Sequence, residues 1–146
     1  HCSDDGEPSG TAGRPALAVL QGSGLGDVAV VVTRYFGGTK LGTGGLVKAY
    51  GDAVREVLKL VRRAVKLPTV TAGLEMPYPL YAQIERLVGI SGGEILESQF
   101  LADVSLIVRF KEENWQPFVQ QLQELSSGKI EPLILERNPE TIFPVD

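Results

Sequence analysis

The sequence predicts an α+β fold made of two small domains, residues 1–66 and 67–137, with a tail at 138–146. The first observation is a reversal of charge: residues 1–66 carry nine basic and six acidic side chains, whereas the remaining residues carry five and twelve. The second is the pair Leu67-Pro68, which interrupts a helical pattern at the same place. The third is an alternation of strand-like and helix-like apolar periods after that pair. A chain of 146 residues is long enough for two such cores.

The first element expected is a short helix over residues 16–20. Arg14-Pro15 opens it, because proline is favoured at the first helical position, and Thr11 or Ser9 is the candidate N-cap. Glycines at alternate positions within 22–26 end it.

A strand is expected next, over residues 27–36. Its β-branched and aromatic residues and its unbroken apolar run are typical of a central strand covered on both faces. A glycine-rich loop at 37–45 follows, and then a helix over 46–62, whose apolar residues recur at steps of three and four. We therefore expect one face of this helix to pack on the sheet and the other to lie in solvent.

The second domain is expected to contain six elements in the order β-α-β-β-α-β. They are a strand over 69–76, a helix opened by Pro79, a hairpin of strands over 94–100 and 102–110, a helix over 114–125 and a strand over 129–136. Pro132 in the last strand indicates an edge position, where a missing N–H donor is tolerated. This order is the split β-α-β, or ferredoxin-like, arrangement. The tail contains two prolines and is expected to be irregular.

The composition narrows the possible chemistry. The single cysteine, Cys2, cannot form an internal disulfide, and its position beside His1 at the start of the chain indicates a terminal remnant rather than a catalytic pair. We predict no catalytic residue, no metal site and no cofactor. No apolar run approaches the roughly 20 residues that span a bilayer. The first residues also lack the features of a signal peptide, so we expect a cytoplasmic location and no membrane partner.

The strongest local signal for a ligand is the glycine-rich loop and the start of the helix after it. Glycines let backbone N–H groups approach a ligand closely, and a helix N-terminus favours an anion, with nearby cations adding charge. The spacing fits neither a P-loop nor a dinucleotide-binding loop, which disfavours ATP and NAD. The same glycines could instead serve only as turns and close packing points. The candidate nucleic-acid or anion-binding residues are Arg34, Gly37, Gly38, Lys40, Gly42, Thr43, Gly44, Gly45, Lys48 and Arg55.

An acidic turn near the start of the chain is the second feature of interest. Asp4, Asp5 and Glu7 could bind a divalent cation or act as acid and base, since hard cations take carboxylate oxygens. They could equally form a solvated or structural turn, because Asp-Gly and Glu-Pro pairs suit tight turns. We favour the structural interpretation and assign the turn no role.

Three motifs occur in order: Ser-Asp-Asp-Gly-Glu-Pro-Ser-Gly-Thr-Ala-Gly at 3–13, Val-Thr-Arg-Tyr-Phe-Gly-Gly at 32–38, and Leu-Gly-Thr-Gly-Gly-Leu-Val-Lys-Ala-Tyr at 41–50. Together they resemble the signature of the IMPACT/YigZ family, and the second half is similar to the bacterial YigZ branch. The resemblance implies a first domain with the fold shared by ribonuclease PH and domain IV of elongation factor G. It implies a second domain similar to domain V of that factor.

The same resemblance implies a protein linked to translation control and stress, suspected of binding nucleic acid, without established catalytic residues. The family's candidate surface maps here onto the loop and helix residues named above, with the acidic turn nearby. In relatives further strands precede the first motif, and His1-Cys2 directly abuts it here. We therefore expect residues to be missing upstream of Cys2 or just after it, which leaves the first domain incomplete.

Three functions are open on these grounds. The first is a non-enzymatic RNA-binding or ribosome-binding protein, such as a translation or stress regulator, whose basic loop and helix contact phosphates. The second is an enzyme acting on a nucleotide or another phosphate-containing ligand through the acidic turn. The third is a regulator that binds a protein, in which the acidic second domain meets a basic partner. We favour the first.

Overall fold

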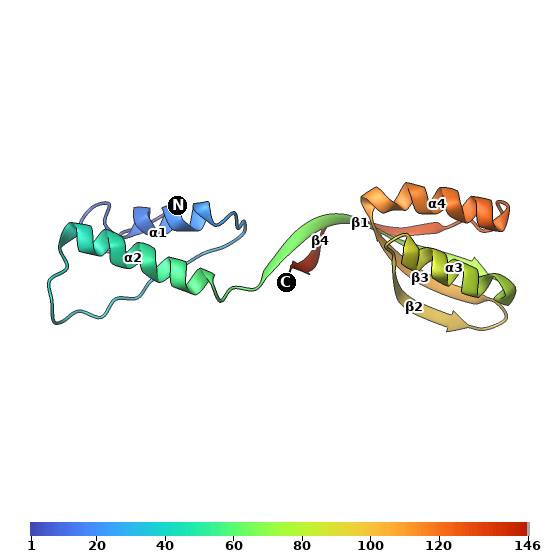
Figure 1. Cartoon of the computed structure of the whole chain (residues 1–146), viewed down its shortest axis with the longest axis horizontal. Coiled ribbons are helices and arrows are strands. Elements are labelled where there is room, and N and C mark those ends of the chain that lie inside the picture. Colours follow the sequence, from blue (N-terminus) through green and yellow to red (C-terminus); the bar gives the residue numbers. More distant parts are fainter. Residues whose placement is uncertain (146) are drawn as a thin grey trace. The chain divides into compact units, whose positions relative to one another are not determined.

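The computed structural model describes residues 1–145, and the chain forms two compact units (Figure 1). The first unit spans His1–Arg62 and the second begins at Arg63. The boundary predicted at Lys66 therefore lies within the first strand of the second unit, β1 (Arg63–Met76). Within residues 1–145, no helix is both long enough and apolar enough to cross a membrane.

Two helices form the first unit, α1 (Gly13–Gly22) and α2 (Gly42–Leu58). They contact each other, and their buried apolar residues include Leu20, Leu46 and Val54. The sequence predicted both helices, although α1 is longer than residues 16–20. The predicted N-caps of α1 are wrong, because Ala12 occupies the N-cap position and its side chain makes no capping hydrogen bond.

The central strand predicted over residues 27–36 is absent from the described structure. These residues form neither helix nor strand, and Val31 and Tyr35 are 89% and 92% exposed. A strand needs a hydrogen-bonded neighbour, and the described residues of the first unit contain no other strand that could pair with it. The local preference for an extended chain is therefore not enough to build a sheet here.

Helix α2 begins and ends four residues earlier than the predicted span of 46–62. At its C-terminal end, the amide of Leu60 donates to the carbonyl of Val57 at 3.0 Å, which closes the last turn. Residues from Arg63 onward are already paired in the sheet, so the helix cannot continue through them. The expected packing of this helix on a sheet is wrong, because the described residues of the first unit contain no strand; its apolar face is buried only in part, and Val57 and Val61 are 45% and 40% exposed.

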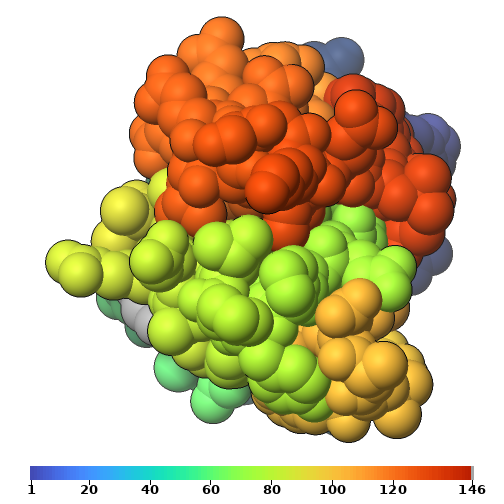
Figure 2. All heavy atoms as spheres, turned by 90° about the vertical axis from the view of Figure 1, so that its right-hand side faces the viewer, coloured from blue at the N-terminus to red at the C-terminus, as the bar shows by residue number. Residues whose placement is uncertain are grey.

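The second unit has the element order that the sequence predicts, β-α-β-β-α-β. After β1 come α3 (Tyr78–Ile90), β2 (Glu94–Phe100), β3 (Val104–Lys111), α4 (Glu112–Ser126) and β4 (Leu133–Val145). The sheet is antiparallel throughout, with the strand order β2-β3-β1-β4. Figure 2 shows the yellow-green residues of α3 next to the orange residues of α4 on one side of this unit.

The core of the second unit lies between the sheet and its two helices. Every second residue of β3, and of β1 from Val70 onward, is buried, and these side chains include Leu74 and Val108. They pack against Ile84 of α3 and Phe118 of α4. The period-two and helical patterns of the sequence therefore identified the buried faces correctly.

The tail does not match its prediction of irregular structure. Strand β4 runs to Val145, and Val145 pairs with Arg63 at the start of β1. The tail is ordered because β1 begins six residues earlier than the predicted strand, which provides a partner for it. The edge position predicted for the last strand is confirmed, since β4 has only β1 as a neighbour, but Pro132 precedes this strand, which begins at Leu133 rather than at residue 129. Pro139 lies beside the register shift between Leu67 and Thr69, where a missing N–H is tolerated.

Candidate functional site

Of the candidate anion-binding residues, only Gly42 to Gly45 form the N-terminal end of α2, and Lys48 follows within the helix; Arg34, Gly37, Gly38 and Lys40 precede it, and Arg55 lies in its last turn. The first turn of this helix, Gly42 to Gly44, is exposed, carries no acidic residue and has no side-chain cap. The first amides of an α-helix lack intrahelical acceptors, so their N–H groups point outward with partial positive charge. Gly42 has a φ of 73°, a left-handed conformation that favours glycine. Gly44 has no such requirement, and a side chain there would meet open space.

The N-terminal end of α1 provides the contrasting case within the same unit. There the carboxylate of Asp4 accepts hydrogen bonds from the amides of Gly10, Ala12 and Gly13 at 2.9, 3.1 and 2.8 Å. These three bonds lower the pKa of Asp4 below its usual value, chiefly the bond from Gly10. Residues 1–145 thus supply an anion to the start of α1 and none to the start of α2.

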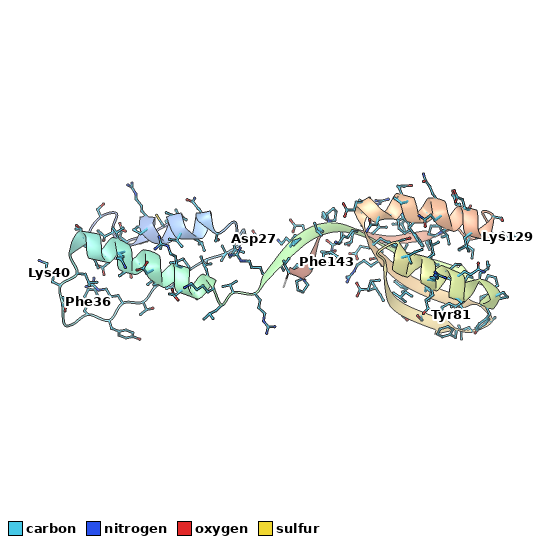
Figure 3. The ribbon with its side chains drawn as sticks, viewed as in Figure 1. Asp27, Phe36, Lys40, Tyr81, Lys129 and Phe143 are labelled. Carbon is cyan, nitrogen blue, oxygen red and sulfur yellow. The ribbon has the colours of Figure 1, made fainter. Side chains whose placement is uncertain are left out.

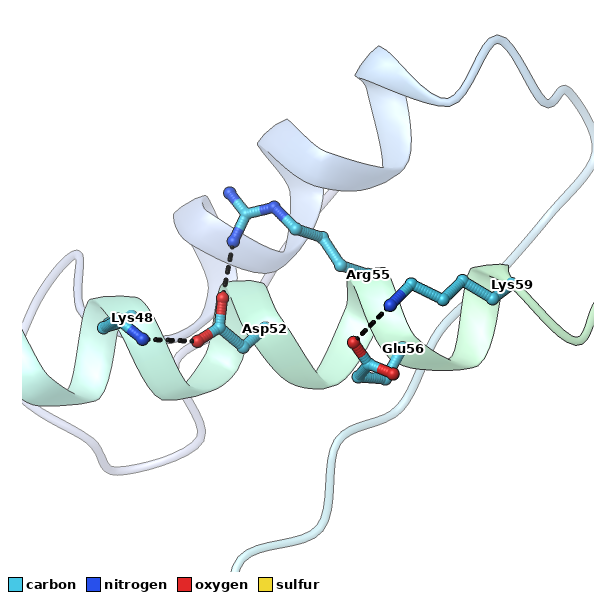
Figure 4. A network of polar contacts seen from close by, with 5 residues as sticks. All are labelled: Lys48, Asp52, Arg55, Glu56 and Lys59. Atoms are coloured by element: carbon cyan, nitrogen blue, oxygen red, sulfur yellow. Dashed lines mark hydrogen bonds and ion pairs between the residues drawn. The ribbon is translucent and has the colours of Figure 1, made fainter.

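Three lysine and arginine side chains flank the exposed end of α2 or continue along it. Lys40 is exposed in the loop beside the start of the helix, and it makes no ion pair with any of residues 1–145 (Figure 3). Lys48 and Arg55 share the carboxylate of Asp52, with contacts of 3.0 and 2.8 Å (Figure 4). The hydrogen bond from Lys48 is the main cause of the lowered pKa of Asp52. Such solvent-exposed pairs are weak, so both cations can exchange partners.

Arg34 has a different environment from the one predicted. Its guanidinium donates to the Glu7 carboxylate at 2.5 Å and lies 4.2 Å from the centre of the Phe36 ring. The hydroxyl of Tyr50 donates to the same Glu7 oxygen at 3.0 Å. Burial raises the pKa of Tyr50, and the bond to Glu7 adds to this shift. Arg34 is thus part of an internal polar cluster that ties the acidic turn, the extended segment and α2 together.

Two of the three carboxylates in the acidic turn have a structural role. Asp4 caps α1 and Glu7 binds Arg34 and Tyr50, so the two point to separate partners, while Asp5 is exposed. Within residues 1–145, no group of three or more His, Cys, Asp or Glu side chains is placed to hold a metal ion. The contacts of Asp4 and Glu7 agree with the structural interpretation of this turn.

Sequence reasoning missed two members of the Glu7 cluster. Phe36 is 78% exposed and lies under the Arg34 guanidinium, and Tyr50 donates a hydrogen bond to Glu7. The only signal available was general, namely that a partly buried tyrosine hydroxyl needs an acceptor. No spacing rule connects Tyr50 to Glu7, because 43 residues separate them.

Known proteins match this chain in both of its units. Residues 1–58 match the Impact N-terminal domain, and residues 74–129 match a domain of unknown function, DUF1949. An IMPACT family member of Thermus thermophilus is 36% identical over 129 residues, which make up 88% of this chain and 72% of that protein. The chain belongs to the IMPACT family. The family resemblance predicted from the three motifs is confirmed.

Two further IMPACT family members are more similar in sequence. The proteins of Haemophilus influenzae and of Escherichia coli, the latter named YigZ, are each 43% identical over 134 residues, or 92% of this chain. The chain spans 65% and 66% of their lengths, slightly less than two thirds. A crystal structure of a hypothetical protein, also 43% identical, superposes with a TM-score of 0.52 and covers 92% of this chain and 65% of that one.

Proposed function

We propose that this IMPACT family chain binds nucleic acid, with RNA or the ribosome as its target, through the exposed end of α2 and the cations beside it. The observation that carries this proposal is the uncapped first turn of α2 next to Lys40. Phosphate oxygens are suited to such a place, because helix amides donate to them and lysine and arginine neutralise their charge. Lys48 and Arg55 would extend the contact along the helix.

The proposal assigns no reaction to the protein. An enzyme acting on a phosphate-containing ligand would need a free carboxylate or metal site next to the loop. Two of the three carboxylates of the acidic turn, those of Asp4 and Glu7, are already bonded within the protein, which leaves only the exposed Asp5 for such a role. We therefore favour binding over catalysis. We also infer a ferredoxin-like second domain similar to domain V of elongation factor G, supported by its element order and its strand order.

The test is a fluorescence anisotropy titration with labelled single-stranded RNA and a labelled RNA hairpin at low salt. We expect binding that weakens steeply as salt is raised, since phosphate contacts release counterions. The double variant Lys40→Glu/Lys48→Glu should lose this binding. The matched control is Arg86→Glu/Lys129→Glu, which makes the same change of charge at exposed positions of the second unit. Equal losses in the two variants, or no affinity of the unchanged protein, would contradict the proposal.

A further inference from the structure

The sheet of the second unit has a face that neither of its helices covers. Side chains along β3 alternate strictly: Val104, Leu106, Val108 and Phe110 are buried, whereas Ser105, Ile107, Arg109 and Lys111 are only partly so. The buried set packs against α3 and α4. The partly exposed set therefore belongs to the opposite face, because successive residues of a strand point to opposite sides.

A row of paired residues, acidic at one end and apolar from Ile107 onward, crosses this open face. Glu97 of β2 pairs with Ile107 of β3, Ile107 with Gly73 of β1, and Gly73 with Leu133 of β4. Leu133 is 67% exposed although it lies on a sheet. Gly73 leaves a depression in the middle of the row, since a Cβ added there would find its nearest side-chain atom, Leu135 Cδ1, at 3.9 Å. The result is a groove of about 310 Å³ with an apolar floor.

The rim of this groove is acidic. Glu75, Glu97 and Glu131 line it, and no lysine or arginine of residues 1–145 does. The Glu97 carboxylate accepts a hydrogen bond from the side-chain amide of Gln99 at 3.2 Å, and all three glutamates are exposed. An apolar floor with carboxylates at its edge matches a lysine or arginine side chain, which has an aliphatic stem and a cationic head.

We propose that this groove docks a basic segment of a partner protein, whose lysine or arginine stems lie over Gly73 and Leu133 while their charged ends meet the glutamates. Charge complementarity selects this occupant. Phosphate-bearing ligands are repelled by the same three carboxylates, so the groove is separate in chemistry from the end of α2. The inference does not depend on nucleic-acid binding by the first unit.

The probe is a short fluorescein-labelled peptide of alternating lysine and leucine, titrated with the whole chain and followed by anisotropy. A peptide of alternating glutamate and leucine serves as its matched control and should not bind. Glu75→Lys/Glu97→Lys should weaken binding of the lysine peptide by about tenfold or more. Glu113→Lys/Glu124→Lys makes the same change of charge at exposed positions of α4, on the other side of the sheet, and should leave the affinity nearly unchanged.

A second variant tests the shape of the groove without changing its charge. Gly73→Val fills the depression, and its Cβ makes only ordinary contacts, so the strand should accept it. We expect this variant also to bind the lysine peptide more weakly. The proposal is overturned if the α4 variant lowers the affinity for the lysine peptide as much as the groove variant does, or if Gly73→Val binds the peptide as tightly as the unchanged chain. Either result would mean that net charge alone attracts the peptide. The proposal would also be overturned if the unchanged chain associated with itself and Glu75→Lys/Glu97→Lys abolished that association. The groove would then bind a second copy of the chain.

Discussion

The carboxylate of Glu7 and the guanidinium of Arg34 lie 2.5 Å apart, although 27 residues separate them in the chain. The Glu7 side chain is only 7% exposed and the Arg34 side chain 27%. Tyr50 donates to the same carboxylate. This contact fixes the acidic turn and the extended segment to α2, and it places the glycine-rich loop between two anchored points.

Removing the Glu7 carboxylate should therefore loosen the first unit. In Glu7→Gln the arginine and the tyrosine lose a charged acceptor, and we expect local stability to fall by about 1–3 kcal/mol. Hydrogen exchange of α1 and α2 amides, followed by mass spectrometry, measures this directly. Asp5→Asn, which neutralises an exposed carboxylate of the same turn, is the control and should leave exchange unchanged. Equal exchange in the two variants would show that the cluster contributes little.

The cap of α1 should depend on pH through Asp4. The pKa of this carboxyl is lowered in the folded protein, so the ionised form stabilises the fold at pH values above its unfolded pKa of about 3.9. That stabilisation is lost as the pH falls through the lower folded value. Thermal melts followed by circular dichroism should show a difference between the unchanged protein and Asp4→Asn that shrinks toward low pH. A difference independent of pH would contradict the assignment of the cap to the ionised group.

A side chain at Gly13 should be poorly tolerated, although alanine is the better helix former. A Cβ there would lie 2.7 Å from the carbonyl oxygen of Ser3 and 2.9 Å from its nitrogen. Gly13→Ala must displace backbone that the Asp4 cap holds in place, which should cost about 1–3 kcal/mol. Gly22→Ala, at the other end of α1, meets nothing within 4 Å and should gain up to ~1 kcal/mol. Chemical denaturation of both variants provides the comparison.

An acid in the first turn of α2 should separate helix stability from ligand binding. Thr43→Asp places a negative charge at the helix N-terminus, which should stabilise α2 by ~0.3–1 kcal/mol. The same charge should repel phosphate and reduce the RNA affinity proposed for this end. Thr43→Asn is the neutral control and should retain binding. If Thr43→Asp binds RNA as well as the unchanged protein does, the first turn of α2 takes no part in binding.

The second unit offers a packing test that its single tryptophan reports. A Cβ on Gly93 would lie 2.4 Å from Cζ of Phe110, whose ring stacks on Phe118 with centroids 4.3 Å apart. Gly93→Ala should therefore cost about 1–3 kcal/mol and perturb the fluorescence of Trp115, which lies 5.8 Å from the Phe110 ring. Gly89→Ala meets nothing within 4 Å and should leave the signal unchanged.

The second unit was predictable because its signals are local. Alternating burial in β3 and the helical spacing of α3 and α4 each reflect which face of an element meets the core. The error at the tail came from the length of β1: a strand's extent depends on its partner, and the partner of Val145 is Arg63. Neither residue carries a local signal for the other.

The sequence proposed the candidate site as a set of residues, which stays a prediction, and it could not show how those residues are arranged. The glycines and cations around α2 could be chosen because an exposed helix N-terminus has a known preference for anions. The sequence could not show that Arg34 is bound by Glu7, or that Asp4 caps α1. The Glu7–Arg34 contact spans 27 positions and the Asp4–Gly13 contact spans nine, and each depends on how the acidic turn folds back over a helix.

By itself, the sequence determined the family, the two-part organisation and the alternation of elements in the second unit, since motifs, charge and apolar periods are properties of neighbouring residues. The tertiary structure decided which charges are already neutralised within the protein and which remain available to a ligand. It also decided that residues 27–36 form no strand, because strand formation needs backbone donors and acceptors from another segment.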